Sequence, residues 1–473
     1  NNSNNSNNSS SNNSSWKDEA KQLIELAIPT VIVKLGSITP QALTASFVGR
    51  HLGPVALDGF MLANLAGNLF TLSILTGLFT ASDTLGPQAF SARNDKEVGL
   101  VAIRAYVASL LALIPANAVL IFALDSVLLA FGQAPAASRL AKDWYRIYVF
   151  GLPFYALQIV TWKFLSAQGI MTPVVVVTVF CTVLLLPALL EFLIPLMGLD
   201  GSAVAVVVFY VVQAFLLLLY VYLTHPHKPE TFNRNTILSL SSWREALAWE
   251  PFWRYVSLGA GGMLAYSEWW YCEVVSLLVG TMGIVALGVH TVLTEVSLVA
   301  FMFPSGLGVA LSIRLGHVLP LRNGVSRAKR LALWTMIGNC VVFGILYLII
   351  MYMARRWICR AFVQDSDVLQ GCERNWWKLC VYCFSFSVFV INMGISNGLG
   401  MQWTFGWITA VLLWVGNLPI LWFTSVWLGG GLDTAWSWIY PPYILMNVVL
   451  IWKFHVTDWN KIRCDVLNRE GLQ

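Results

Sequence analysis

The chain has 473 residues, of which 57% are hydrophobic and only 11% are charged. Soluble domains carry about a quarter charged residues, so this composition excludes a soluble globular protein. The formal net charge is +5, but no basic stripe is interleaved with aromatic residues, so we expect no binding to nucleic acid.

Residues 1–15 are Asn and Ser only. Such a tract cannot bury enough apolar surface to offset the entropy lost on ordering, so we expect a disordered tail. The tract also lacks the basic segment and the apolar segment of a signal peptide.

Twelve apolar runs follow, each long enough to cross a bilayer. A helix needs about 20 apolar residues to span a hydrocarbon core of about 30 Å. The runs are continuous and lack the alternation of barrel strands, which predicts an all-α polytopic membrane protein. The expected helices are centred near Val33, Leu72, Leu110, Leu157, Leu185, Val212, Tyr271, Leu298, Phe343, Phe386, Leu413 and Val448.

A polar segment separates the first six runs from the last six. Its stretch 243–249 is amphipathic and rich in Trp, which predicts an interfacial helix at headgroup depth. The predicted organisation is a tail at 1–15, an N-lobe at 16–223, a cytosolic linker at 224–253, a C-lobe at 254–453 and a cytosolic tail at 454–473.

The two halves repeat a short pattern at the same turn. Residues 48–57 read VGRHLGPVAL, and residues 279–287 read VGTMGIVAL. Six helices per half keep the two copies parallel, so we expect two pseudo-symmetric six-helix bundles. This arrangement is typical of transporters that bind substrate between the halves.

The distribution of basic residues predicts the orientation. More Lys and Arg lie in the segments that face the cytosol when the N-terminus is inside, which favours two cytosolic termini. The sequence does not decide between the plasma membrane, the vacuolar membrane and another endomembrane. We expect a monomer whose main partners are the lipid bilayer and a small-molecule substrate.

Several polar residues interrupt the helices of the first half. Lys34 lies in the middle of the first run and Glu191 in the fifth, so each should face a cavity or form an ion pair between helices. Asn64 and Asn68, in the second helix, could line the same cavity.

Three further polar residues lie near the expected cytosolic ends of helices two and four. We interpret Asp83, Gln88 and Gln168 as gate or helix-packing residues rather than ligands of a substrate. Trp162 and Lys163 could equally brace the two halves.

The seventh run contains two carboxylates. An ionised side chain at mid-membrane costs about 2.5–3.5 kcal/mol, so such residues usually serve transport or proton relay. Glu268 and Glu273 lie about 140° apart around a helix, on different faces. Glu295 is a third acid, in the eighth run. Burial disfavours a charged carboxylate, so such a group can exchange a proton for a cation, as an antiporter requires.

Aromatic residues surround the first of these acids. Tyr266, Trp269 and Trp270 could hold a cationic aromatic substrate through cation–π contacts. We therefore expect these three rings to line the same cavity as the acids.

The eight cysteines do not form a secreted disulfide framework. Cys380 and Cys383 have the spacing of metal ligands but lie in a predicted membrane helix without a second pair, so we expect no metal site. Cys359 and Cys372 flank the outer loop after helix nine, which permits a disulfide or two free thiols.

At these residues the chain resembles the multidrug and toxin extrusion (MATE) family, in its eukaryotic branch, from about Trp16 to Lys453. The motifs that carry the resemblance are SEWW with a following Glu at 267–273, LTE at 293–295, PSGLGVA at 304–310, RLG at 314–316, DTL with QA at 83–89, and KFL with QG at 163–169. The resemblance implies twelve helices in two lobes and cation-coupled efflux, generally driven by protons in this branch. By position, Glu268, Glu273 and Glu295 match the functional acids of the family.

The chain departs from the family pattern in three places. Segment 384–394 of helix ten lacks the usual acid, and segment 397–402 lacks the usual basic residue. The first helix has Lys34 and no acid. The coupling of ion movement to substrate transport must then depend on the acids of helices seven and eight, or the coupling mechanism has changed.

We predict an antiporter that exports organic cations or other metabolites by alternating access. The coupling ion would be H⁺ or Na⁺, with no other cofactor. No nucleophile–base set is present, so we expect no enzyme activity. A lipid flippase or scramblase would need a basic cavity of headgroup size, and a receptor or scaffold is suggested by the missing acid; both alternatives stay open.

Overall fold

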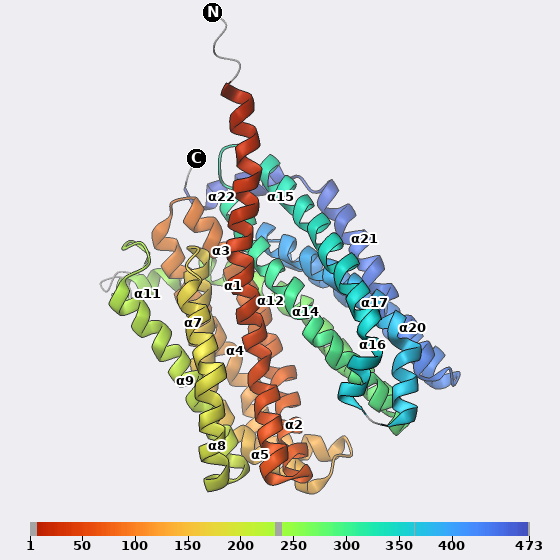
Figure 1. Cartoon of the computed structure of the whole chain (residues 1–473). Coiled ribbons are helices and arrows are strands. Elements are labelled where there is room, and N and C mark those ends of the chain that lie inside the picture. The colour runs from red at the N-terminus through yellow and green to blue at the C-terminus, as the bar shows by residue number, and fades with distance from the viewer. Residues whose placement is uncertain (1–6, 232–238, 364, 472–473) are drawn as a thin grey trace, which may run out of the picture.

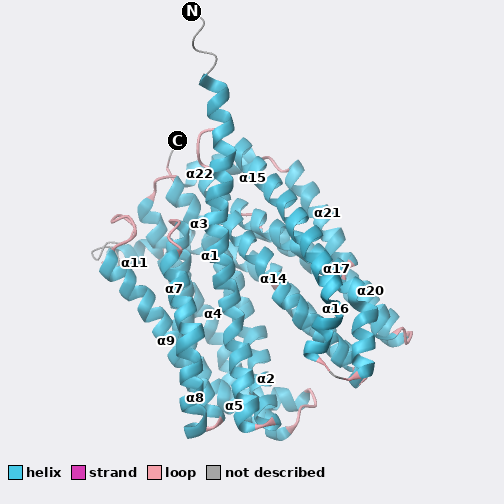
Figure 2. Cartoon of the chain, in the orientation of Figure 1, coloured by secondary structure: helices cyan, strands magenta, loops and turns pink. Residues whose placement is uncertain are grey.

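The computed structural model describes residues 7–231, 239–363 and 365–471. These residues form helices and connecting turns, with no strand among them, as Figure 2 shows. Two helical bundles lie together at the end of the molecule where both chain termini are found, and they diverge toward the opposite end (Figure 1). We call these the terminal end and the distal end.

The twelve expected spans are present. Ten of them are single or composite helices that are long and apolar enough to cross a membrane; the seventh and the twelfth are built from shorter pieces. The N-lobe contains α1 (Asn7–Leu52), α2 (Pro54–Gly67), η1 (Asn68–Leu72), α3 (Ser73–Ser91), α4 (Asp95–Ala130), α5 (Pro135–Tyr148), η2 (Val149–Gly151), α6 (Leu152–Ala167), α7 (Thr172–Phe180), η3 (Cys181–Leu185), α8 (Leu186–Met197) and α9 (Leu199–Thr224).

The C-lobe repeats this plan. It contains α12 (Trp249–Ala265), α13 (Ser267–Gly280), α14 (Ile284–Val318), α15 (Gly324–Asn339), η4 (Cys340–Tyr347), α16 (Leu348–Phe362), α17 (Ser366–Leu399), α18 (Gln402–Ala410), η5 (Val411–Asn417), α19 (Leu418–Leu421), η6 (Trp422–Trp427), α20 (Gly431–Ile439) and α21 (Pro441–Val456). The last helix, α22 (Trp459–Arg469), lies at the terminal end.

The first helix begins earlier than expected. α1 starts at Asn7, so it includes residues 7–15 of the tract for which we expect disorder, and this part projects beyond the bundle (Figure 1). Asn and Ser are weak helix formers, and here they extend a helix that the apolar residues after them stabilise. Residues 1–6 lie outside the described residues.

The linker is shorter than expected. The seventh span begins at Trp249, inside the predicted linker 224–253, and the short helix α11 (Leu240–Ala246) precedes it. Arg104 of α4 donates a hydrogen bond to the carbonyl of Ala246 at 2.9 Å. The helix α11, which overlaps the first part of the stretch predicted to be interfacial, is therefore anchored on the N-lobe, while residues 232–238 of the linker lie outside the described part.

Glycines of α3 and α12 allow a close approach between the lobes. A side chain on Gly262 of α12 would overlap Thr80 and the backbone carbonyl of Gly77 in α3. A side chain on Gly77 would likewise overlap the backbone of Met263. Small residues allow helix backbones to pack this closely inside a membrane.

Polar contacts close the terminal end between the lobes. Gln88 of α3 donates to the carbonyl of Gly398 in α17 at 2.9 Å, and Ser91 donates to the carbonyl of Gly316 at 3.0 Å. Thr84 donates to the carbonyl of Asn397. These bonds join spans two, eight and ten, so the lobes are sealed at this end.

Candidate functional site

The seventh span is broken at Tyr266, where α12 ends and α13 begins. Glu268 lies in the first turn of α13 and is only 5% exposed. The hydroxyl of Tyr443 donates to its Oε1 atom at 2.8 Å, and the thiol of Cys272 donates to the same atom at 3.1 Å. Among the described residues, no donor reaches Oε2 and no Lys, Arg or His pairs with this carboxylate. One oxygen of a buried acid is therefore left for a proton or a cation.

Aromatic rings fill the space beside this acid. Tyr382 and Phe386 of α17 lie 5.2 and 5.5 Å from the ring of Tyr443, centroid to centroid, and Phe386 stacks on Phe301 of α14 at 3.7 Å. Ser387, the next residue, accepts a hydrogen bond from Asn339 at 3.1 Å. The part of helix ten in which the sequence lacks an acid thus packs rings around the partner of Glu268.

The other two acids form a separate group. Glu273 of α13 is half-buried and lies close enough to Glu295 of α14 for their charges to repel each other. Glu295 is exposed on the surface of the chain, and neither takes part in an ion pair within the described ranges. The structure therefore brings together two of the three predicted acids and holds Glu268 apart.

The aromatic residues predicted to line the cavity differ from one another in their surroundings. The indole N–H of Trp270 donates to the carbonyl of Leu69 at 2.8 Å and to the hydroxyl of Ser73 at 3.0 Å, so it joins the C-lobe to the N-lobe. Trp269 is exposed and contacts the edge of the Tyr266 ring at 5.3 Å. Sequence reasoning missed the partners of Trp270, because no local pattern links α13 to η1.

A buried ion pair lies in the N-lobe. The ammonium of Lys163 in α6 contacts both carboxylate oxygens of Asp83 in α3, at 2.6 and 2.8 Å. Asp83 is buried, so it is not the solvated boundary residue that its place in the sequence suggests. Lys34 of α1 lies nearby, with its ammonium 5.9 Å from the centroid of the Trp162 ring.

Of the two asparagines predicted to line the cavity, Asn68 is hydrogen-bonded within the N-lobe. Asn68 accepts a hydrogen bond from Gln41 at 2.9 Å, within the N-lobe; Asn64 is half-buried. Glu191 is exposed on α8 and lies 3.8 Å from His51 at the end of α1. Of the two expectations for Glu191, a cavity residue or a member of an ion pair between helices, this position fits the second, because the fifth span carries the residue to the distal end.

The two glutamines near the terminal end have distinct partners. Gln88 donates to α17 and accepts a hydrogen bond from Arg469 of α22 at 2.8 Å. Gln168 accepts from the backbone N–H of Lys228 at 3.3 Å. Gln88 therefore contacts the opposite lobe, whereas Gln168 positions the start of the linker.

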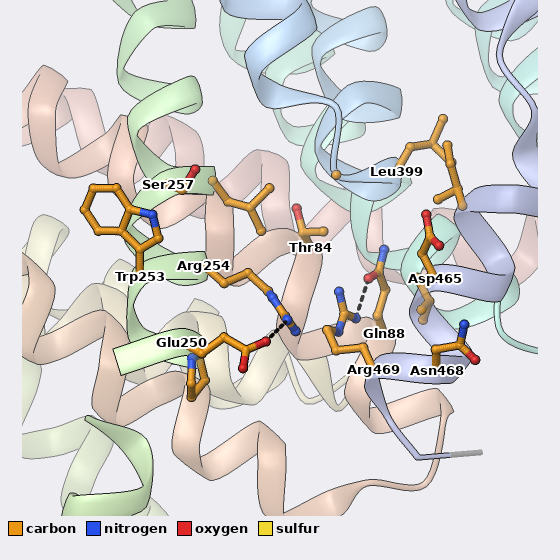
Figure 3. A pocket seen from close by; sticks show the side chains of 15 residues that line it. Thr84, Gln88, Glu250, Trp253, Arg254, Ser257, Leu399, Asp465, Asn468 and Arg469 are labelled. Carbon is orange, nitrogen blue, oxygen red and sulfur yellow. Dashed lines mark hydrogen bonds and ion pairs between the residues drawn. The ribbon is translucent and has the colours of Figure 1, made fainter. Parts of the chain in front are cut away.

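A cavity of about 1010 Å³ lies at the terminal end between α3, α12, the end of α17 and α22 (Figure 3). Arg254 and Glu250 pair with each other on its α12 wall, 3.1 Å apart. Arg469 closes the other side through its bond to Gln88. Sequence reasoning did not find this cavity, because its walls come from four segments that are distant in the sequence.

The cysteines of interest are free thiols. Cys359 and Cys372 are both buried and lie within hydrogen-bonding reach of each other, but no disulfide joins them. Over the described ranges, no group of three or more His, Cys, Asp or Glu residues could hold a metal ion. Cys380 and Cys383 are buried singly in α17.

The two-lobed arrangement of helices agrees with the protein family that the chain matches. The family model MatE matches residues 29–190 and 263–423, which cover spans from both lobes. The chain belongs to the MATE family. This membership makes it a transporter of the multidrug and toxin extrusion type, as the sequence motifs predict.

Vertebrate MATE proteins are among the relatives of this chain. The human multidrug and toxin extrusion protein 1 is 28% identical over 86% of this chain and 69% of its own length. The rabbit multidrug and toxin extrusion protein 2 is 29% identical over 96% of this chain and 74% of its own length. The relationship therefore extends over nearly the whole chain.

Solved MATE structures share the fold. The eukaryotic MATE transporter AtDTX14 superposes with a TM-score of 0.87 over 96% of this chain and 99% of its own, at 20% identity. The bent form of the Vibrio cholerae MATE transporter VcmN gives a TM-score of 0.78, covering 96% and 99% of the two chains, at 16% identity. The prediction of two six-helix bundles of MATE type is confirmed.

Proposed function

We propose that this MATE protein is a proton-coupled antiporter that exports organic cations, with Glu268 as the group that exchanges a proton for the substrate. The single observation that supports this role is the arrangement of donors around Glu268. Both Tyr443 and Cys272 bind Oε1, which leaves Oε2 without a described protein partner. A buried carboxylate in this state gains from binding either a proton or a cation.

The competition at one oxygen supplies the coupling. A proton on Glu268 removes the negative charge that attracts a cationic substrate. A bound cation stabilises the ionised carboxylate and so weakens the binding of a proton. Binding of one therefore promotes release of the other. The pair Glu273 and Glu295 supplies further negative charge on spans seven and eight, along which a cation could move.

The arrangement of the lobes fits one state of an alternating-access cycle. The bonds between the lobes lie at the terminal end, including that of Gln88 to Gly398, and the bundles diverge toward the distal end (Figure 1). With both termini in the cytosol, this is the outward-facing state. Export then requires the terminal end to open and the distal ends to approach each other.

The alternative of a non-transporting scaffold was suggested by the missing acid of helix ten. The rings of Phe386 and Tyr382 occupy that part of the lobe, but they leave the hydrogen bonds of Glu268 intact. Coupling through one buried acid would therefore suffice for exchange.

The test uses the full chain in lipid vesicles. Uptake of labelled organic cations would be measured with and without a pH gradient, for wild type and Glu268→Gln. We expect gradient-dependent uptake by wild type and loss of the gradient response in the variant. Equal uptake by wild type with and without the gradient would contradict proton coupling, and transport driven by a Na⁺ gradient instead would identify the other ion.

A further inference from the structure

We propose that the C-lobe binds the headgroup of an anionic phospholipid at its terminal end, through a basic patch on its surface. The patch consists of Arg322 in the turn before α15, Lys329 and Arg330 in the first turns of α15, and Arg463 at the start of α22. This inference goes beyond the proposed function, because it concerns neither the substrate nor the coupling proton. With the termini in the cytosol, the lipid belongs to the cytosolic leaflet.

The segment that joins the eighth and ninth spans is basic and has no acid of its own. Residues 314–330 contain four arginines and one lysine, and no Asp or Glu occurs from residue 296 to residue 364. Two of the arginines, Arg314 and Arg327, pair with the carboxylate of Glu19 in α1. The other three basic side chains are exposed and form no ion pair within the described residues.

The last helix adds a fourth charge at the same place. The Nε atom of Arg463 donates to the carbonyl of Leu321 at 3.3 Å, and the ammonium of Lys329 lies 5.8 Å from the centroid of the Trp459 ring. Trp459 and Arg463 are four residues apart, so they share one face of α22. This face lies against the turn before α15 and the start of α15. The four basic side chains therefore form one surface, although they come from segments far apart in the sequence.

The patch differs from the basic residues that face it in the N-lobe. At the same end of the molecule, Lys96 pairs with Glu245 at 2.6 Å and Lys228 with Asp95 at 3.0 Å. The acid next to the patch, Asp458, caps α22 and accepts from the backbone N–H groups of its first turn. An excess of basic residues is usual on the cytosolic side. Their gathering without carboxylate partners, in contrast, favours an anionic ligand.

The surroundings of the patch indicate that this ligand is a lipid. Leu333, Trp334 and Ile337 follow Arg330 at the spacing of one helix face, and they are 58%, 59% and 41% exposed. This face belongs to the ninth span, so it contacts acyl chains, and Trp334 lies about 6 Å deeper than Arg330 along the helix. Basic clusters next to a membrane span attract anionic lipids. A phospholipid matches both the charges and the apolar face below them, whereas an acidic peptide or a nucleic acid matches only the charges.

The experiment counts lipids on the purified full chain in detergent by native mass spectrometry. Phosphatidylserine and phosphatidylcholine with identical acyl chains would be titrated separately, so that the two ligands differ in the headgroup alone. We expect wild type to bind phosphatidylserine about tenfold more tightly. In Lys329→Gln/Arg330→Gln this preference should be lost, because the affinity for phosphatidylserine falls while that for phosphatidylcholine stays. Lys329→Arg/Arg330→Lys keeps both charges and should keep the preference.

The matched control is Arg355→Gln/Arg360→Gln, which removes the same charge from the distal end of the same span. This variant should keep the wild-type preference, because both residues lie in α16, far from the patch. Two soluble competitors test whether the acyl chains matter. Glycerophosphoserine, which is the headgroup without chains, and poly-glutamate should each leave phosphatidylserine bound when added at an equal concentration.

Equal affinities of wild type for the two lipids, or an unchanged preference in Lys329→Gln/Arg330→Gln, would overturn the inference. The same loss in Arg355→Gln/Arg360→Gln would also overturn it, since net charge rather than the patch would then decide binding. Displacement by either competitor would assign the patch to a soluble anionic partner and not to a lipid. Because none of these measurements involves transport, they are independent of the outcome for proton coupling.

Discussion

Arg469 donates a hydrogen bond to Gln88 at 2.8 Å and thereby connects the last helix of the chain to the second span. The neighbouring Glu470 is buried and accepts from Asn94 at 2.9 Å. Both contacts lead from α22, which follows the C-lobe, to the N-lobe. The C-terminal helix therefore holds the terminal end closed.

Removal of this link should favour opening of the terminal end. In Arg469→Ala we expect the distal ends to spend more time close together, because one bond that stabilises the present state is lost. Spin labels at Asp58 and Thr281, both exposed at the distal end, would report the distance by pulsed electron resonance. Arg463→Ala is the control, since Arg463 donates within the C-lobe to the carbonyl of Leu321. Identical distance distributions in wild type and Arg469→Ala would contradict the role of Arg469 in holding the terminal end closed.

A second link at this end is ionic. Glu19 of α1 is buried and pairs with Arg314 of α14 and Arg327 of α15. Because Glu19→Gln leaves two arginines without their carboxylate, we expect the protein to lose about 1–3 kcal/mol of stability. Thermal unfolding in detergent measures the loss. Glu25→Gln should change little, because Glu25 pairs with Lys21 at 3.9 Å on the exposed surface; equal effects of both variants would contradict the prediction.

The dependence of the transport rate on pH should be determined by Glu268 and not by Glu191. Wild type should show initial rates that vary with pH in vesicles, and Glu268→Gln should lose at least tenfold in rate, about 1.4 kcal/mol in transition-state terms. Glu191→Gln should keep the wild-type profile, because Glu191 lies by His51 at the distal end. A changed profile in Glu191→Gln would mean that the fifth span takes part in coupling.

The orientation can be tested through a native thiol. Cys464 of α22 is exposed at the terminal end, whereas Cys359 and Cys372 are buried. If both termini are cytosolic, an impermeant maleimide should label Cys464 only after the cells are permeabilised. Cys464→Ser provides the background. Labelling of Cys464 on intact cells would reverse the proposed orientation, and with it the outward-facing assignment.

The sequence predicted the twelve spans well, because each span needs only a local run of apolar residues. It predicted poorly which polar residues meet. Glu268 and Tyr443 are 175 residues apart, and Asp83 and Lys163 are 80 apart, so their contacts depend on how whole spans pack. The break at Tyr266 was missed for another reason. The residue itself is neither Gly nor Pro, and no local signal marks it.

The acids illustrate the same limit. Helical geometry correctly separated Glu268 from Glu273, because an angle around one helix follows from spacing alone. It could not show that Glu273 would lie near Glu295, since that proximity depends on the packing of α13 against α14. The two expectations for Glu191 stayed open for this reason too: its position along the span was readable, but the neighbours of that face were not.

The glycine contact between α3 and α12 has a mechanical consequence. Gly262 lies against Thr80 and the backbone carbonyl of Gly77, and Gly77 lies against the backbone of Met263, so neither glycine has a side chain of its own that must change rotamer when the lobes turn. This contact can act as a pivot between the lobes. A helix of about 20 residues extends about 30 Å beyond such a point, so each degree of rotation moves its far end by about 0.5 Å. Small rearrangements around Gln88 and Glu19 at the terminal end would thus produce larger displacements at the distal end.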